Sequence, residues 1–423
     1  MMMTVVKLIL LGMTLLQVGG CSWRLCPECP SCPQPLADMV LPEVVERLQP
    51  EPVMPEPPAP PALIPVNWGE VEGWTEDDHG QALGAFLRSC AAMGQRPQWQ
   101  QVCTEATLLE DRSAGAVRDF FEQRFRPHQM RKPDGDPVGL ITGYYVPDLR
   151  GSRQTSPAYP YPLYRRPADL LVVDLREAYP ELGNYRLRGR LVDMQVRPYW
   201  DRGTIDGEQQ PLAGQELLWV DDSVELFFLQ IQGSGRILFE DGSRVMVNYA
   251  EQNGRPYRSI GKWLLDRGAM PLERMSMQNI KAWARANTGY VKEMLSSNPS
   301  YVFFRELPGD ADSPPGALGV PLTPERSIAV DPRHTPMGAP VFVATTWPGS
   351  NRPLARLMMA QDTGGAIKGP VRADFFWGVG EAAGSKAGLM KQPLRIWVLL
   401  PVDAPALLRL DITAPHELIR WVR

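Results

Sequence analysis

The chain has 423 residues, with 48 acidic and 44 basic side chains and a formal net charge of −4 at pH 7. This near balance, and the lack of a basic stripe interleaved with aromatic residues, argue against a nucleic-acid partner. The length exceeds what one hydrophobic core usually holds, so we expect more than one domain.

The first twenty residues have the pattern of an export signal. Lys7 lies in a short N-terminal region, an apolar run extends to Leu16, and the stretch VGGC ends at Cys21. The run is shorter than the ~20 residues that a helix needs to cross a bilayer. Small residues before a cysteine resemble the lipobox at which bacterial lipoproteins are cleaved and acylated. We therefore predict a signal peptide over residues 1–20 and lipidation of Cys21.

The residue after the cysteine bears on localisation. Ser22 stands where Asp would favour retention in the inner membrane, so the pattern predicts an outer membrane lipoprotein that faces the periplasm of a Gram-negative bacterium. The alternative is cleavage before Cys21, which would give a soluble secreted protein.

Residues 21–66 form a predicted tether. Thirteen prolines fall between Cys26 and Pro65, among few apolar residues, which predicts a semi-rigid polyproline-type segment without a core. Cys26, Cys29 and Cys32 have zinc-knuckle-like spacing, but no fourth ligand follows nearby. We interpret them as tether cysteines, with cross-linking left open, and we predict no metal site.

Two amphipathic helices follow the tether. Thr75 and Asp78 have the spacing of a capping box before the first apolar stripe, and a second stripe follows after residue 113. Cys90 and Cys103 lie in this globular part, and an oxidising compartment predicts a disulfide between them. The apolar stripes consist of Leu83, Phe86, Leu87 and Cys90, and of Ala116, Val117, Phe120 and Phe121.

From about Ile141 the chain changes to short β-rich runs separated by Pro, Gly and Asp. The stretches LWVDD, ELFFLQIQ and RILFE predict strands, and Asp241 with Gly242 predicts a hairpin turn before RVMVNYA. Helices are expected over 260–266, with Gly268 as the stop, and over 277–286, with Ser276 as the cap. After Phe304, the runs SIAVD, APVFVAT, LARLMMAQD and LRIWVLLP predict strands of a small closed barrel.

Two carboxylates flank a glycine-rich loop in the stretch QDTGGAIKGPVRADFFWG, residues 361–378. Asp374 precedes two Phe and a Trp, and such apolar neighbours raise the pKa of a carboxyl group and keep its proton available. Asp362 precedes Thr and two Gly, whose backbone N–H groups favour the charged form. Either aspartate alone is equally typical of a turn.

Five stretches, in order, resemble the membrane-bound lytic murein transglycosylase A (MltA) family. They are ITGYYVP from Ile141, FLQIQGSGRI from Phe228, NGRPYRSIGKWLLDRG from Asn253, NPSYVFF from Asn298, and the loop with the two aspartates. The resemblance implies a mainly β fold, in which a double-psi β-barrel is built from N- and C-terminal segments. A second β-rich domain is inserted, with a few helices.

Domain limits follow from that mapping. The barrel would comprise residues 67–167 and 307–423, and the MltA-specific insert would comprise residues 168–306. The C-terminal part corresponds to the family's 3D module, named for three aspartates that match Asp331, Asp362 and Asp374.

The resemblance also implies a reaction. The family cleaves the β-1,4 bond between N-acetylmuramic acid and N-acetylglucosamine in peptidoglycan and leaves a 1,6-anhydromuramoyl end. One carboxyl group suffices and no cofactor is expected, because the sugar's own C6 hydroxyl replaces water. Asp374 matches the catalytic residue, with Asp362 and Asp331 in supporting roles. Expected partners are glycan strands, the membrane through the lipid anchor, and other cell-wall enzymes.

Residues near these motifs are candidates for contact with the sugars. Tyr144 and Tyr145 either stack on sugar faces or pack in the core, and both interpretations stay open. The candidates are Thr142, Gly143, Tyr144, Tyr145, Gln232, Gly233, Ser234, Gly364 and Lys368.

Two other functions fit parts of the sequence. Asp-Thr-Gly is also the signature of aspartic proteases, but those enzymes combine two such loops and this chain has one, at Asp362. A wall-binding lipoprotein without activity is the second alternative, and the presence of Asp374 favours the enzyme instead.

Overall fold

The computed structural model describes residues 63–309 and 311–403. The chain divides into two units, Met1–Pro57 and Pro58–Arg423, and every described residue belongs to the second unit. The predicted signal peptide, Cys21, the cysteines at 26, 29 and 32, and nearly all of the tether lie outside the described residues. Within the described ranges, no helix combines the length and apolar character that a membrane span requires.

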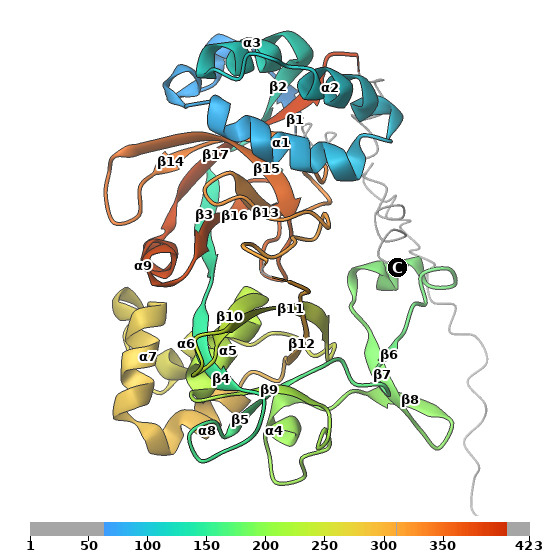
Figure 1. The fold of residues 1–423 in the computed structure, drawn as a ribbon, viewed down its shortest axis with the longest axis vertical. Helices are drawn as coiled ribbons and strands as arrows, with labels where there is room; N and C mark the ends of the chain where they lie inside the picture. The colour runs from blue at the N-terminus through green and yellow to red at the C-terminus, as the bar shows by residue number, and fades with distance from the viewer. Residues whose placement is uncertain (1–62, 310, 404–423) are drawn as a thin grey trace, which may run out of the picture. The chain divides into compact units, whose positions relative to one another are not determined.

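Strands from both ends of the described chain build an eight-stranded sheet (Figure 1). Its order is β1-β2-β17-β14-β15-β13-β16-β3, and β3 also pairs with β17, so the pairings of six strands form a closed ring. The mainly β fold is thereby confirmed. The strands are β1 (Leu63–Pro65), β2 (Phe125–Met130), β3 (Gly139–Val146), β13 (Ser327–Val330), β14 (Pro340–Thr346), β15 (Pro353–Asp362), β16 (Arg372–Val379) and β17 (Lys391–Pro401).

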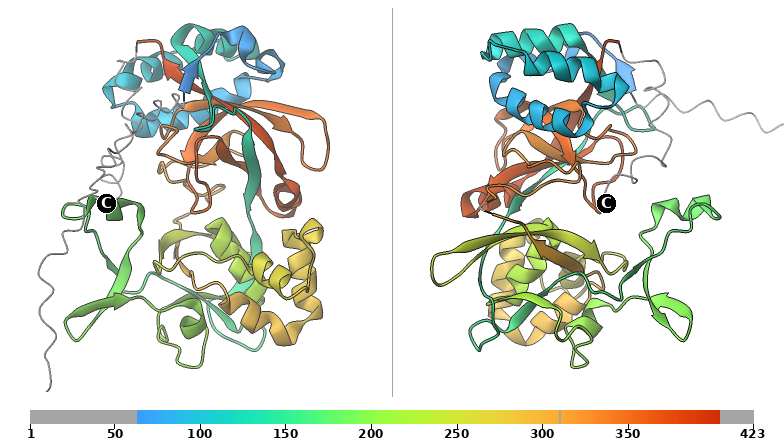
Figure 2. Two further views of the ribbon diagram at one scale, coloured as in Figure 1. Left: turned by 180° about the vertical axis from the view of Figure 1, so that it is seen from behind. Right: turned by 45° about the vertical axis from the view of Figure 1, so that its right-hand side comes forward.

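Three helices pack together on this sheet (Figure 2): α1 (Gly80–Met93), α2 (Pro97–Thr107) and α3 (Ala114–Arg124). A disulfide joins Cys90 of α1 to Cys103 of α2, with 5.4 Å between their Cα atoms. The 3₁₀ helices η1 (Trp68–Glu70) and η2 (Trp74–Glu76) precede α1.

The predicted capping box at α1 is wrong. The helix begins at Gly80, and its N-cap residue, His79, makes no capping hydrogen bond through its side chain. Asp78 instead accepts a hydrogen bond from the side-chain amide of Gln81, and Thr75 lies within η2. The intervening 3₁₀ turn moves the true helix start beyond the predicted cap.

A second sheet has six strands in the order β12-β11-β10-β4-β9-β5. Two of them, β4 and β5, precede residue 168, so the chain enters this sheet directly after Pro147, earlier than the boundary expected from the sequence. The strands are β4 (Asp148–Ser152), β5 (Tyr161–Tyr164), β9 (Glu216–Val220), β10 (Ser234–Leu238), β11 (Arg244–Gln252) and β12 (Val302–Glu306).

The remaining elements accompany the second sheet, except for α9. A three-stranded sheet branches from the loop after β5, and five helices lie along the inserted segment (Figure 1). These elements are β6 (Leu171–Val172), η3 (Pro180–Asn184), β7 (Arg188–Val192), β8 (Gln195–Pro198), α4 (Arg202–Ile205), α5 (Ser223–Gln232), α6 (Ile260–Asp266), η4 (Leu272–Arg274), α7 (Met277–Ala286), α8 (Thr288–Ser296) and α9 (Glu381–Leu389).

The predicted strand ELFFLQIQ is wrong, because these residues form α5. The carboxylate of Asp222 accepts hydrogen bonds from the backbone N–H groups of Val224 and Glu225 and so begins the helix. Gly233 ends it in the left-handed conformation, with φ of 80°. A short apolar run that is buried on several faces has no clear period, so its pattern does not separate strand from helix.

Other local predictions are confirmed. Asp241 and Gly242 form the turn between the antiparallel strands β10 and β11, and Gly242 has φ of 82°. Helices α6 and α7 have the predicted bounds, and the Ser276 hydroxyl accepts a hydrogen bond from the N–H of Asn279 at the start of α7.

Candidate active site

Asp374 lies in the interior of β16, beside two other strands of the ring. It pairs with Thr142 on the parallel strand β3 on one side and with Ala329 on the antiparallel strand β13 on the other. Ala373 and Phe375 are fully buried in the main core, whereas Asp374 is only partly buried. Alternation along the strand therefore directs Asp374 away from the main core, on the same face as Arg372.

Three side chains form a hydrogen-bonded chain at this point. The Thr142 hydroxyl donates to Oδ1 of Asp374 over 2.6 Å. Nη2 of Arg372 donates in turn to the Thr142 oxygen over 2.8 Å. The Asp374 carboxylate is thus bound by the Thr142 hydroxyl, which is in turn bound by the Arg372 cation, two residues before Asp374 on β16.

Burial, helped by the nearby charge of Asp362, raises the pKa of Asp374 to about 6, although the Thr142 hydrogen bond and the Arg372 charge both lower it. A raised pKa of Asp374 is what its apolar neighbours in the sequence predicted. A carboxyl group with such a pKa holds a proton for part of the time at neutral pH, as a general acid requires.

Asp362 is the last residue of β15, where the glycine-rich loop begins. Its Oδ1 accepts hydrogen bonds from the N–H groups of Ala317 and Thr363, each over 2.9 Å. The backbone donors expected from the sequence are therefore present. Burial outweighs them, however, and the pKa of Asp362 is raised rather than lowered.

Asp331 follows β13 and is almost fully buried, with 1% of its surface exposed. It accepts hydrogen bonds from the guanidinium group of Arg333 and from the N–H of Gly369, the latter over 2.8 Å. Burial raises its pKa, but the hydrogen bonds from Arg333 and Gly369 prevail and hold it at about 2. These hydrogen bonds join Asp331 to Arg333 and to Gly369 of the glycine-rich loop, and none of them reaches Asp374.

Tyr144 and Tyr145 are buried, with 8% and 7% of their surfaces exposed. The Tyr144 ring packs 5.1 Å from the ring of Phe376. The ring of Tyr145 lies against Gly384 of α9, where an added Cβ would come within 2.6 Å of it. Of the two interpretations left open by the sequence, these contacts favour packing.

The motif Gln232-Gly233-Ser234 connects the second sheet to β3. The Gln232 side chain accepts a hydrogen bond from the N–H of Tyr145 over 3.0 Å. The Ser234 hydroxyl accepts one from Asn248 over 2.8 Å. Both side chains thus have partners within the protein near the strand that carries Thr142.

The remaining candidates lie on β3 and in the loop. At Gly143, a Cβ would come within 2.8 Å of the Trp377 indole nitrogen, so a larger residue does not fit. At Gly364, a Cβ would come within 2.8 Å of the Ile367 side chain. Lys368 is exposed, and its side chain is free to reach a ligand at the loop.

Arg372 is the site residue that sequence reasoning missed. It is two positions before Asp374, and residues at i and i+2 on a strand share a face. A strand prediction over β16 would have placed both side chains together.

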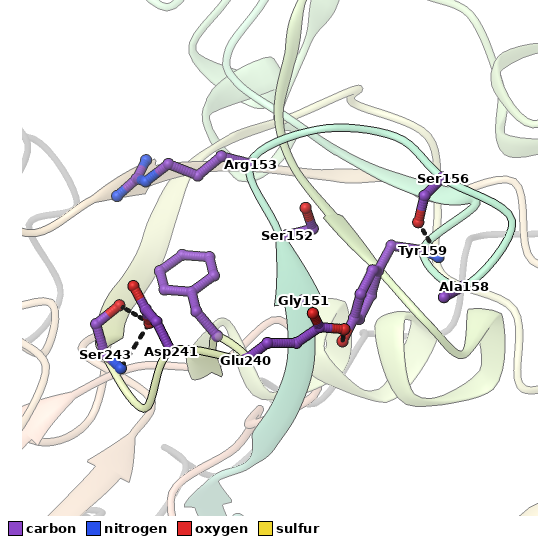
Figure 3. Close-up of a pocket in the computed structure, with 10 residues that line it drawn as sticks. Gly151, Ser152, Arg153, Ser156, Ala158, Tyr159, Glu240, Asp241 and Ser243 are labelled. Atoms are coloured by element: carbon purple, nitrogen blue, oxygen red, sulfur yellow. Dashed lines mark hydrogen bonds between the residues drawn. The ribbon is translucent and has the colours of Figure 1, made fainter.

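Within the described residues, no group of three or more His, Cys, Asp or Glu side chains is arranged to hold a metal ion. A pocket of about 410 Å³ lies in the second sheet, between the segment after β4 and the β10–β11 turn (Figure 3). Its polar groups bond to one another, as Tyr159 does to Glu240 and Ser243 to Asp241. Asp374 is not among its lining residues, so we place the site at Asp374 on chemistry rather than on cavity size.

Two family models match this chain. The MltA specific insert domain matches residues 140–305, and the 3D domain matches residues 326–400. The second match includes Asp331, Asp362 and Asp374.

Known proteins agree with these matches. A membrane-bound lytic murein transglycosylase A of Vibrio cholerae is 33% identical over 286 residues, which cover 64% of this chain and 69% of the relative. The crystal structure of MltA from Neisseria gonorrhoeae in its monoclinic form is 37% identical, with a TM-score of 0.71 over 81% of this chain and 93% of that one. Escherichia coli MltA with bound chitohexaose is 28% identical, with a TM-score of 0.62 over 81% of this chain and 95% of that one. This chain belongs to the membrane-bound lytic murein transglycosylase A family.

Proposed function

We propose that Asp374 is the single acid and base with which this chain cleaves peptidoglycan. The protein is a lytic transglycosylase that acts on the β-1,4 bond between N-acetylmuramic acid and N-acetylglucosamine. The observation that carries the assignment is the hydrogen-bonded chain from Arg372 through Thr142 to Asp374, and the raised pKa of Asp374, about 6, agrees with it. Of the three aspartates of the 3D module, Asp331 has the opposite shift and is bound to Arg333.

The reaction needs one carboxyl group because it consumes no water. Protonated Asp374 gives its proton to the glycosidic oxygen, and the bond between that oxygen and the muramic acid C1 breaks, with the electron pair remaining on the departing N-acetylglucosamine O4. The C6 hydroxyl of the same muramic acid forms the new bond to C1. Its proton returns to the Asp374 carboxylate, so the enzyme ends in its starting state. Ordinary glycosidases need a second carboxylate for water or for a nucleophile.

The other two aspartates support the loop between β15 and β16. Asp362 binds Ala317 and Thr363 at the start of the loop, and Asp331 binds Gly369 near its end. Their proposed role is to fix the loop so that Gly364 and Lys368 face the glycan strand. The relative with bound chitohexaose supports an extended glycan as the ligand.

The same family likeness supports a finer description of the fold. We propose that the ring of six strands is a double-psi β-barrel, and that the segment from β4 to β12 is an inserted domain. The chain then crosses between the two after Pro147 and after Glu306. The glycan strand would pass along the side of the barrel that carries Asp374.

The anchor is part of the proposal as well. Curated relatives are named membrane-bound, which agrees with acylation at Cys21 and with attachment of this chain to a membrane. We propose the outer membrane, with the enzyme facing the periplasm, from the residue after the cysteine.

The experiment that tests the function measures whether oxygen from water enters the new muramoyl end of the product. Digestion of purified sacculi in ¹⁸O-labelled water should give anhydromuropeptides without label, because the C6 oxygen closes the new ring. A hydrolytic muramidase run in parallel should give labelled reducing ends. Mass spectrometry separates the two products, since the anhydro product is one water lighter. Labelled reducing ends as the main product of this chain would assign it to the ordinary glycosidases.

A further inference from the structure

We propose that Arg372 is a positioning residue that acts through Thr142 and fixes Oδ2 of Asp374 as the oxygen that carries the transferable proton. The inference rests on the proposed role of Asp374 as the acid and adds to it the identity of the oxygen and the group that selects it. It starts from the hydrogen-bonded chain where β3 and β16 pair side by side.

The direction of the two hydrogen bonds follows from the donors. A guanidinium group carries only donors, so in its bond to Thr142 the hydroxyl oxygen must accept. The hydroxyl has a single proton, and the short bond of 2.6 Å to Oδ1 of Asp374 takes it. Donation from a cation polarises the hydroxyl group and makes it a stronger donor and a weaker acceptor. Oδ1 is therefore held as an acceptor.

Because Oδ1 accepts the hydrogen bond from Thr142, it cannot easily carry the proton of Asp374 as well. If the proton of Asp374 were on Oδ1, it would face the Thr142 hydroxyl proton. Two donors would then oppose each other, and the hydrogen bond from Thr142 would be lost. The proton therefore resides on Oδ2, the oxygen that these two hydrogen bonds leave free. Without Arg372, the Thr142 hydroxyl could rotate and accept a hydrogen bond from a protonated Oδ1, which would direct the acid toward the protein rather than toward the substrate.

The guanidinium group is itself held in place. Nη1 of Arg372 donates to the carbonyl oxygens of Ala373 and, over 3.4 Å, of Leu140, while Nη2 donates to Thr142. One planar fork thus bonds to β16 and to β3. A lysine has one nitrogen at the end of a flexible chain and does not reproduce this arrangement.

Few other charged groups act on Asp374. Arg372 is on the same strand and Asp362 is at the end of β15. On β3, burial raises the pKa of the Tyr144 hydroxyl well above its ordinary value and keeps that group neutral. The neighbour on β13 is Ala329, which has no charge. Arg372 is therefore the cation that opposes burial at Asp374, and its removal should make the carboxyl group a weaker acid.

The first test is the pH dependence of kcat/KM on soluble glycan strands. In Arg372→Met the fall in kcat/KM at high pH should move upward by about one pH unit, because an Arg beside an Asp lowers its pKa by one or more units. The rate at the optimum should also fall, since a weaker acid transfers its proton more slowly. Arg395 of β17 binds Glu72 and is not among the charged groups that act on Asp374, so Arg395→Met should leave the pH profile unchanged.

The second test isolates the path through Thr142. In the Thr142→Val background, Arg372→Met should shift the pH profile by less than in the wild type, because only the through-space effect of the charge remains. Thr142→Ser keeps a hydroxyl group and should retain the full shift. Equal shifts in the wild-type and Thr142→Val backgrounds would show that Thr142 plays no part and would overturn the proposal.

A third measurement does not depend on turnover. The ¹³C resonance of the Asp374 carboxyl group, assigned by its absence in Asp374→Asn, should titrate at higher pH in Arg372→Met. Arg372→Lys keeps a charge and should show a smaller shift, and it replaces the Met variant if that variant does not fold. An unchanged titration in both variants would refute the role of Arg372. If Asp374→Asn itself retained activity, the proposed function would fail first, so the two failures are distinguishable.

Discussion

At the scale of single residues, Asp374 and Asp331 show how two aspartates acquire opposite pKa shifts. Both lie beside the same loop and both are affected by burial. Asp331 has a guanidinium partner and a backbone donor, which outweigh burial and keep it ionised. Asp374 has one hydroxyl donor, and burial prevails. The number and charge of the donors therefore account for the opposite pKa shifts of Asp374 and Asp331.

Replacing Asp374 by Asn should abolish turnover while the fold is kept. General acid–base catalysis contributes ~10²–10⁴-fold, and here one group serves both half-reactions. Release of anhydromuropeptides from sacculi measures the loss. Glu381→Gln, which neutralises an exposed carboxylate at the start of α9, is the matched control and should keep wild-type activity. More than about a tenth of the wild-type rate in Asp374→Asn would contradict the assignment, given that range.

The pH dependence of the wild type should follow the same group. The acid must be protonated in the free enzyme, and its pKa is about 6. We expect kcat/KM to fall about tenfold for each pH unit above that value. A profile that stays flat between pH 6 and 8 would show that another group supplies the proton.

Asp374→Asn should also change stability, in a direction that depends on pH. The pKa of Asp374 is raised from 3.8 to about 6, so its ionised form is disfavoured in the folded state. That destabilisation is absent below the unfolded-state pKa, grows as pH rises toward 6, and is complete above it. The neutral Asn variant should therefore be more stable than the wild type at pH 7, by on the order of 2 kcal/mol, and similar at pH 4. Urea denaturation at both pH values measures the difference.

Asp331→Asn provides the opposite control. The pKa of Asp331 is lowered to about 2, so its ionised form stabilises the folded state above the unfolded-state pKa, and this stabilisation is lost as pH falls toward 2. The Asn variant should therefore be less stable than the wild type at pH 7. A loss of stability in both Asn variants would mean that packing, not charge, dominates at these positions.

At the scale of secondary-structure elements, the sequence predicted those with a clear period and clear ends. Helices α6 and α7 have serine caps, Ser259 and Ser276, and their bounds were predicted correctly. Helix α5 was assigned to the wrong class, because its apolar residues are buried on more than one face and remove the period. Helix α2 was missed, since Pro97 at its start is as typical of a turn.

The sequence likewise predicted some features of the candidate site and missed others. The aspartates beside the loop were proposed as site residues from residue type and family likeness. The raised pKa of Asp374 agrees with the prediction from its apolar neighbours. Thr142 was identified only as a sugar contact, yet it bonds to Asp374. That bond depends on the parallel register of β3 and β16, which brings together residues from opposite ends of the chain. Short-range patterns carry no information about such a register.

The disulfide between α1 and α2 should stabilise the helical layer. It closes a loop with a sequence separation of 13, for which the chain-entropy model gives about 3 kcal/mol. Helix α1 also supplies the carbonyl oxygen of Ala85 and the hydroxyl of Ser89 as partners for the Gln361 amide, next to Asp362. We expect Cys90→Ser with Cys103→Ser to lower the melting temperature measured by circular dichroism.

Peptide mapping without reductant checks the bond directly. The fragments that contain Cys90 and Cys103 should be recovered as one linked peptide from protein purified from the periplasm. Wild-type protein treated with dithiothreitol should melt at the temperature of the double variant. Free thiols at both positions before reduction would contradict the bond.

At the scale of the whole molecule, the proposed anchor separates location from catalysis. Cys21→Ser should prevent acylation and move the protein from the membrane fraction to the soluble periplasmic fraction. Activity of the purified variant on isolated sacculi should stay at the wild-type level, because Cys21 lies far along the sequence from the described catalytic residues. Membrane fractionation that does not change in the variant would contradict the lipoprotein assignment.

The ring of strands also determines at which stage of folding the region around Asp374 can form. Strand β17 closes the ring by pairing with β3 and β14, and it extends the sheet to β2, through contacts between residues 125–129 and 397–401. Contacts so distant in sequence make folding slow, and they cannot form until β17 is available to pair. A nascent chain therefore has Asp374 before it has the closed ring that holds β3 and β16 in place. We therefore expect a chain truncated before β17 to lack activity on the cell wall.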